Sequence, residues 1–98
     1  MNKIENPISI CIPRIDIEQT KEYILEKFKQ LDIGQIVSIK EIPLRNDNKH
    51  KRIIILLILN EHNPQSIDVC NRLKKNETIK LVYEMPWYWK IVSTSPQK

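Results

Sequence analysis

The residues of this chain best suited to binding chemistry lie in one five-residue segment. Residues 86–90 read Pro-Trp-Tyr-Trp-Lys and hold both tryptophans and one of the three tyrosines. An aromatic ring beside a cation can stack on a nucleic-acid base while the cation contacts a phosphate. The same residue types also anchor protein interfaces. We therefore predict that binding involves Trp87, Tyr88, Trp89 and Lys90.

Three interpretations of this aromatic segment remain open from the sequence. Its rings stack on bases, or contact a protein partner, or cover the aliphatic residues 54, 56 and 58 and complete the core. In an extended strand, alternation puts Trp87 and Trp89 on one face and Tyr88 and Lys90 on the other.

The polar stretch 45–52 is a second candidate, and we expect it to form a basic loop. Such a loop either binds phosphates, with an affinity that falls as salt rises, or is a solvated hairpin tip. Arg14 is a further cation that can meet a phosphate, although we favour an ion pair with Glu84 across the sheet. The basic residues of the stretch are Arg45, Lys49, His50, Lys51 and Arg52.

The sequence gives little support to catalysis or metal binding. His50 and His62 are the only histidines, and neither has a serine, cysteine or carboxylate at a catalytic spacing. Cys11 and Cys70 are far apart and show no zinc-ligand spacing, so we expect reduced thiols. The single glycine, Gly34, leaves no glycine-rich phosphate loop. We predict a non-enzymatic protein without a metal, cofactor or small-molecule substrate.

Composition indicates one globular domain. The 98 residues are 41% hydrophobic and 29% charged, enough for one modest core. The net charge of +4 is compatible with a nucleic-acid partner and also common in proteins without one. The longest apolar run, 53–59, is too short to span a bilayer, and the first seven residues do not resemble a signal peptide. We therefore expect no membrane association.

Hydrophobic periodicity predicts the element order β-α-β-β-α-β. Thr20 has the residue type of a helix N-cap, and Gly34 is expected to end that helix in a left-handed conformation. Asn63 and Pro64 mark the start of a second helix. The predicted strands are 8–12, 35–44, 53–59 and 79–84; the first helix is 20–31, and the second turns Ile67, Cys70 and Leu73 inward.

This order is that of the ferredoxin-like α+β fold, with a four-stranded antiparallel sheet and two helices on one face. The other face is expected to be open to solvent or to a partner. We expect residues 1–7 to be an N-terminal extension, 8–92 the domain and 93–98 a flexible C-terminal tail.

Two motifs resemble those of one particular family within this fold class. Residues 9–14 read Ser-Ile-Cys-Ile-Pro-Arg, and residues 84–90 read Glu-Met-Pro-Trp-Tyr-Trp-Lys. With the element order, they resemble the short RNA-recognition-motif-like (RRM-like) proteins of nucleocytoplasmic large DNA viruses, the giant viruses. The resemblance covers roughly residues 8–95. It implies an RRM-like fold, binding of RNA or single-stranded nucleic acid, and a location in the host cytoplasm, a virus factory or the virion.

One departure from that family supports an alternative function. RRM domains bind RNA through aromatic side chains on their first and third strands. The matching positions here are Ser9, Cys11 and Ile54, and none is aromatic. The first hypothesis is nucleic-acid binding through the basic loop 45–52 and the segment 86–90. The alternative is protein interaction or homodimerisation through an interface of Ser9, Cys11, Ile54, Leu56 and Ile58.

Overall fold

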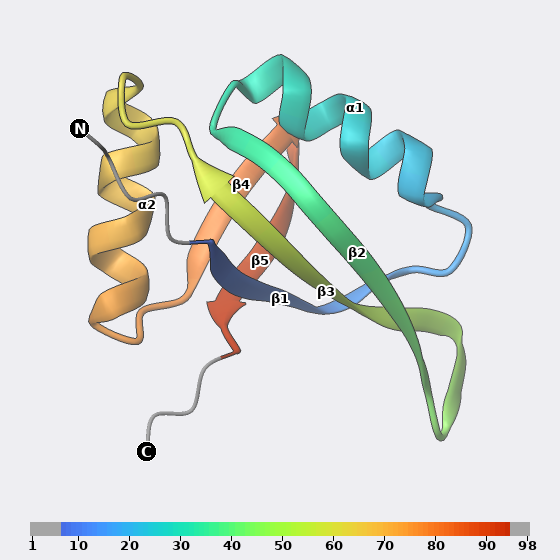
Figure 1. Ribbon diagram of the computed structural model, residues 1–98. Coiled ribbons are helices and arrows are strands. Elements are labelled where there is room, and N and C mark those ends of the chain that lie inside the picture. Colours follow the sequence, from blue (N-terminus) through green and yellow to red (C-terminus); the bar gives the residue numbers. More distant parts are fainter. Residues whose placement is uncertain (1–6, 95–98) are drawn as a thin grey trace.

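A computed structural model describes residues 7–94, in which five strands and two helices form an α+β domain (Figure 1). Residues 1–6 and 95–98, within the expected extension and tail, lie outside the described residues. Ser93 still belongs to a strand, and the Thr94 hydroxyl donates to the carbonyl oxygen of Ser9 at 3.2 Å. The elements are β1 (Ile8–Asp16), α1 (Lys21–Leu31), β2 (Gly34–Leu44), β3 (Asp47–Leu59), α2 (Pro64–Lys74), β4 (Ile79–Glu84) and β5 (Trp87–Ser93).

The sheet has five antiparallel strands, in the order β2-β3-β1-β5-β4. The prediction of four strands was therefore wrong by one, although the arrangement is compatible with the ferredoxin-like class. The aromatic segment, expected to follow the last strand, begins a fifth strand, β5; its residues pair with β4, and Val92 and Ser93 further along β5 pair with β1. Met85 and Pro86 form the turn that folds β4 back onto β5 as a hairpin. The predicted strand 79–84 is β4 and lies at the sheet edge.

The β2–β3 hairpin is longer than its apolar residues predicted. The stretch 45–52 was expected to be a loop, but β3 begins at Asp47, and only Arg45 and Asn46 form the turn. Backbone pairing continues through the polar residues, as in the pair Pro43 and Lys51. A strand ladder is held by main-chain hydrogen bonds, so it can extend past the end of the apolar core. In Figure 1 this hairpin projects away from both helices.

The N-cap and the last residue of α1 were predicted correctly, but the left-handed residue that follows the helix was not. The Thr20 hydroxyl accepts a hydrogen bond from the Tyr23 N–H at 3.1 Å, which confirms the N-cap. The left-handed residue at the other end is Asp32, with φ 55°, and not Gly34. Gly34 starts β2, where a Cβ atom would lie 2.4 Å from the carbonyl oxygen of Ile58. The glycine is therefore required by a close approach of two backbones.

The second helix also begins as predicted, because the Asn63 side chain accepts from the Gln65 N–H at 2.9 Å and Pro64 is the first residue. Its inner face is different: α2 buries Ser66, Val69 and Leu73, and Ile67 is 49% exposed. Ser66 is buried because its hydroxyl lies 2.9 Å from the carbonyl oxygen of Ile33 and 2.6 Å from that of Asn60. A polar residue thus occupies a position that hydrophobic periodicity gave to an apolar one.

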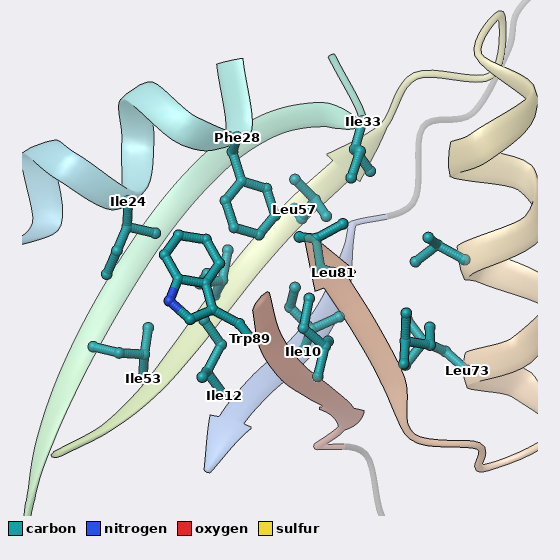
Figure 2. Close-up of a cluster of buried hydrophobic side chains, with 14 of the residues drawn as sticks. Ile10, Ile12, Ile24, Phe28, Ile33, Ile53, Leu57, Leu73, Leu81 and Trp89 are labelled. Atoms are coloured by element: carbon teal, nitrogen blue, oxygen red, sulfur yellow. The ribbon is translucent and has the colours of Figure 1, made fainter. Parts of the chain in front are cut away.

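The core lies between the two helices and one face of the twisted sheet (Figure 2). Phe28 of α1 faces Trp89 of β5, and their ring centroids are 5.9 Å apart. Figure 2 shows Ile10 and Ile12 of β1 pointing into the same cluster. Because alternate strand residues point to opposite faces, the residues between these core positions form a second surface, which we call the open sheet face.

Candidate functional site

The two motifs singled out in the sequence meet at one surface groove. Pro13 and Arg14 of β1 form one part of it, and the turn and first residues of β5 form the rest. The groove has a volume of about 460 Å³. We call it the aromatic groove; it is lined by Pro13, Arg14, Pro86, Trp87, Tyr88, Trp89 and Lys90.

The three aromatic residues of this segment have different environments. Trp87 is 63% exposed and Tyr88 is 43% exposed, so both rings are accessible to a ligand. Trp89 is only 4% exposed, and its ring belongs to the core. The prediction that Trp89 contacts nucleic acid is corrected on this evidence. Of the three aromatic rings in this segment, only that of Trp89 is part of the core. This ring lies on the helix side of the sheet rather than over Ile54 and Leu56.

A hydrogen-bonded contact holds the buried ring in place beneath the groove. The indole N–H of Trp89 donates to Oε1 of Gln19 at 3.0 Å, and Nε2 of the same amide donates to the Tyr83 hydroxyl at 3.1 Å. The rings of Tyr83 and Trp89 stack with centroids 4.1 Å apart. Gln19 therefore fixes two stacked rings that lie beneath the first residues of β5.

The ion pair of Arg14 differs from the one favoured in the sequence. Its Nη2 lies 2.9 Å from Oδ2 of Asp47 at the start of β3. Glu84 instead accepts from Lys27 at 3.1 Å and from the Tyr23 hydroxyl at 3.3 Å. The hydrogen bond from Lys27 is the main cause of a lowered pKa of Glu84. Arg14 remains at the groove with a side chain that is 66% exposed.

The structure separates the predicted basic residues of 45–52. Lys51 is buried, and its Nζ lies 2.8 Å from Oε2 of Glu41, a hydrogen bond that lowers the pKa of this carboxyl. Lys51 is therefore corrected from a phosphate ligand to a structural ion-pair residue. Arg52 points to the opposite face and is exposed. Arg45 and Lys49 are exposed on the β2–β3 hairpin and do not line the groove.

The residues of the predicted interface do share one surface. Ser9 pairs with Leu56 and Cys11 with Ile54, and directly opposed residues project from the same face of a sheet. Ile58 lies on that face by alternation with Leu56. These residues form an aliphatic part of the open sheet face. Burial raises the pKa of the Cys11 thiol, so Cys11 is an apolar packing residue rather than a reactive one.

Four cations surround that aliphatic part on the open sheet face. Lys80 and Lys90 are opposed in the β4–β5 hairpin, and the alternate pairs Ile79–Ile91 and Leu81–Trp89 are in the core. None of the four cations lies in an ion pair with a described carboxylate. They are Lys40, Arg52, Lys80 and Lys90.

Lys40 and Lys80 were missed in the sequence analysis. Alternation along the strand could have identified them, because both lysines lie next to inward-facing residues in strands that were predicted from the sequence. Lys80 also contacts the exposed aromatic surface: its Nζ lies 5.2 Å from the ring centroid of Tyr88. This contact joins the aromatic groove to the open sheet face, which is why we treat them as one candidate surface.

Other features offer less specific chemistry. A larger groove of about 780 Å³ lies between α1 and β2, but Glu22, Glu26 and Lys29 give it mixed charge. Within residues 7–94, no group of three or more His, Cys, Asp or Glu side chains is arranged to hold a metal ion. Neither described helix is long and apolar enough to cross a membrane.

No protein-family model matches this chain, and no curated protein sequence or solved structure matches it. The aromatic groove, the open sheet face and the charges around them are therefore the features from which a function can be inferred.

Proposed function

We propose that this chain is an RRM-like module that binds single-stranded nucleic acid, and RNA in particular, at the aromatic groove. One observation carries the proposal: exposed Trp87 and Tyr88 lie in the same groove as Arg14 and Lys90. None of the described residues that line the groove is acidic. The motif resemblance to short RRM-like viral proteins supports the same assignment.

The two kinds of side chain complement the two parts of a nucleotide. Each base has an apolar face, and stacking on an aromatic ring contributes roughly 1–3 kcal/mol per base. Arg14 and Lys90 supply cations for the phosphates that flank a stacked base. The rings need unpaired bases, so the arrangement favours a single strand over a duplex.

The open sheet face extends this surface beyond the groove. Lys80 and Lys90 are like charges at directly opposed positions, an arrangement that costs stability in a free hairpin. A bound polyanion removes that repulsion. Arg52, which has no ion pair with a described carboxylate, adds a further cation on the same face, so a strand leaving the groove meets positive charge.

The test is fluorescence anisotropy of a labelled single-stranded RNA at ~50 and ~200 mM salt. We expect binding that weakens steeply with salt, and a large loss of affinity on Trp87→Ala or Lys90→Glu. Lys75→Glu is the matched control, because Lys75 is an exposed residue at the end of α2. If wild type does not bind, or if both lysine variants weaken binding equally, the groove is not the site.

A second candidate, self-association or protein binding through the open sheet face, is favoured by the half-buried aliphatic side chains there. Ile54, Leu56 and Ile58 recur along β3, and Val82 on β4 is 40% exposed. Light scattering tests it: Leu56→Asp should convert a dimer into a monomer. A monomeric wild type would exclude homodimerisation.

A further inference from the structure

Arg14 is the one cation of the aromatic groove that already has an anionic partner. Its guanidinium carries five N–H donors, and the contact with Asp47 uses Nη2. The side chain is 66% exposed, so its remaining donors are open to an incoming anion. Lys90, the other cation of the groove, has no such partner among the described residues.

Asp47 is the centre of a small charge cluster on the β2–β3 hairpin. Its Oδ2 is shared, because Nη2 of Arg14 lies at 2.9 Å and Nδ1 of His50 at 3.0 Å. Its Oδ1 accepts the backbone N–H of Lys49 at 3.0 Å. Asp16 of β1 is opposite His50 in the strand register, and Lys49 and Lys51 flank His50 along β3. Arg14 and His50 thus contact the same carboxylate oxygen.

We propose that Asp47 sets the ligand affinity of the aromatic groove by holding Arg14, and that His50 controls how firmly it is held. The inference rests on the proposed function, since it concerns regulation of the same site. A phosphate that binds the open donors of Arg14 is repelled by the Asp47 carboxylate, which lies 2.9 Å from Nη2 of the same guanidinium. Removing the charge of Asp47 therefore strengthens binding, which is the opposite of what loss of a ligand contact does.

Protonation of His50 should change the ligand affinity in the same direction as removal of the Asp47 charge, because both strengthen binding. A histidine gains its proton between about pH 8 and pH 5, within the physiological range. The new positive charge neutralises Asp47, repels Arg14 and attracts a phosphate. Asp47 remains ionised meanwhile, because the Lys49 N–H, and then His50 and Arg14, lower the pKa of its carboxyl. Ligand affinity is thus expected to rise as the pH falls through this range.

The experiment measures the affinity of a labelled oligouridylate for wild type and Asp47→Asn at pH ~8. Asp47→Asn should bind ~2–5-fold more tightly, since exposed ion pairs are worth about this much. The slope of log K against log salt should steepen by ~0.7, because one more phosphate is neutralised. Asp68→Asn is the matched control: Asp68 also pairs with an arginine, at 3.5 Å, but lies on α2.

Two further variants connect the effect to its named residues. In Arg14→Gln, the added change Asp47→Asn should give no gain, which a double-mutant cycle measures. In His50→Gln, the tightening of wild type between pH ~8 and ~6 should disappear. This pH series needs no change at Asp47, so it tests the inference even where Asp47→Asn fails to fold.

The outcomes separate the inference from the proposed function. If Trp87→Ala weakens binding but Asp47→Asn binds no more tightly than Asp68→Asn, the control by Asp47 is refuted and the groove stands. A gain that persists without Arg14 also refutes it. If neither wild type nor Asp47→Asn binds the probe at either pH, both the inference and the proposed function fail.

Discussion

Replacing the two tryptophans one at a time should give opposite results, although they are two residues apart. Trp89 is 4% exposed and packs between Phe28 and Tyr83. Truncating a buried tryptophan to alanine costs about 3–5 kcal/mol of stability, and the Gln19 amide then loses its indole partner, a further ~1 kcal/mol. A domain of this size has only ~5–15 kcal/mol in total. Trp89→Ala should therefore leave the chain partly or largely unfolded.

Trp87→Ala should leave the fold intact and weaken binding. The ring is 63% exposed and is not part of the buried core cluster. A surface substitution of this kind changes stability by about 0.5 kcal/mol or less. Loss of one stacking ring costs roughly 1–3 kcal/mol of binding, which is about a 5- to 150-fold loss of affinity.

The assay pairs urea unfolding, followed by circular dichroism, with RNA anisotropy on the same preparations. Trp87→Phe is the control for Trp87→Ala, because it keeps a stacking surface and should keep most of the affinity. The reasoning is refuted if Trp87→Ala lowers the urea midpoint as much as Trp89→Ala does. It is also refuted if Trp89→Ala unfolds at the wild-type midpoint.

Three other predictions concern the scaffold. Gly34→Ala should lower stability by roughly 1–3 kcal/mol, because the new Cβ would lie 2.4 Å from the Ile58 oxygen; an unchanged urea midpoint would contradict this. Gln19→Ala should cost about 1–3 kcal/mol by leaving the Trp89 indole unpaired, and a red-shifted tryptophan emission should accompany it. The folded-state pKa values of Glu41 and Glu84 are lowered by their lysine partners, so their stabilisation is complete above the ordinary glutamate pKa of 4.5 and is lost as the pH falls below it. Glu41→Gln should flatten the decline in urea midpoint below that pH, and an unchanged slope would exclude this ion pair as a cause.

Local features were the most predictable part of the fold. The caps Thr20 and Asn63 make hydrogen bonds within two or three residues, so the neighbouring sequence determines them. The strand register implied by the RRM resemblance likewise placed Ile54 and Leu56 on the open sheet face, where they lie opposite Cys11 and Ser9. Both features depend only on the backbone geometry of a single helix or strand.

Features that depend on pairing between distant strands were not predictable in the same way. Alternation placed Trp87 and Trp89 on the same face of a strand, so it did not show that one ring would be exposed and the other buried. The partner of Arg14 depends on an irregularity between Ile12 and Ile15, which changes the register of β1 against β3. The burial of Lys51 depends on Glu41 across the hairpin, in a strand ladder that polar residues were not expected to form.

The pairing of β1 with β5 also has a consequence for how the domain folds. These strands meet at Ile10–Ser93 and Cys11–Val92, and the Thr94 hydroxyl reaches a carbonyl 85 residues away. Joining residues this far apart along the chain costs loop-closure entropy before their contacts stabilise the fold. Topologies of this kind fold in milliseconds to seconds. The aromatic groove has one wall on each of these strands. An intermediate in which β2, β3 and β1 have paired but β5 has not would have a partial sheet and no groove, so recovery of ligand binding should be among the last events of refolding.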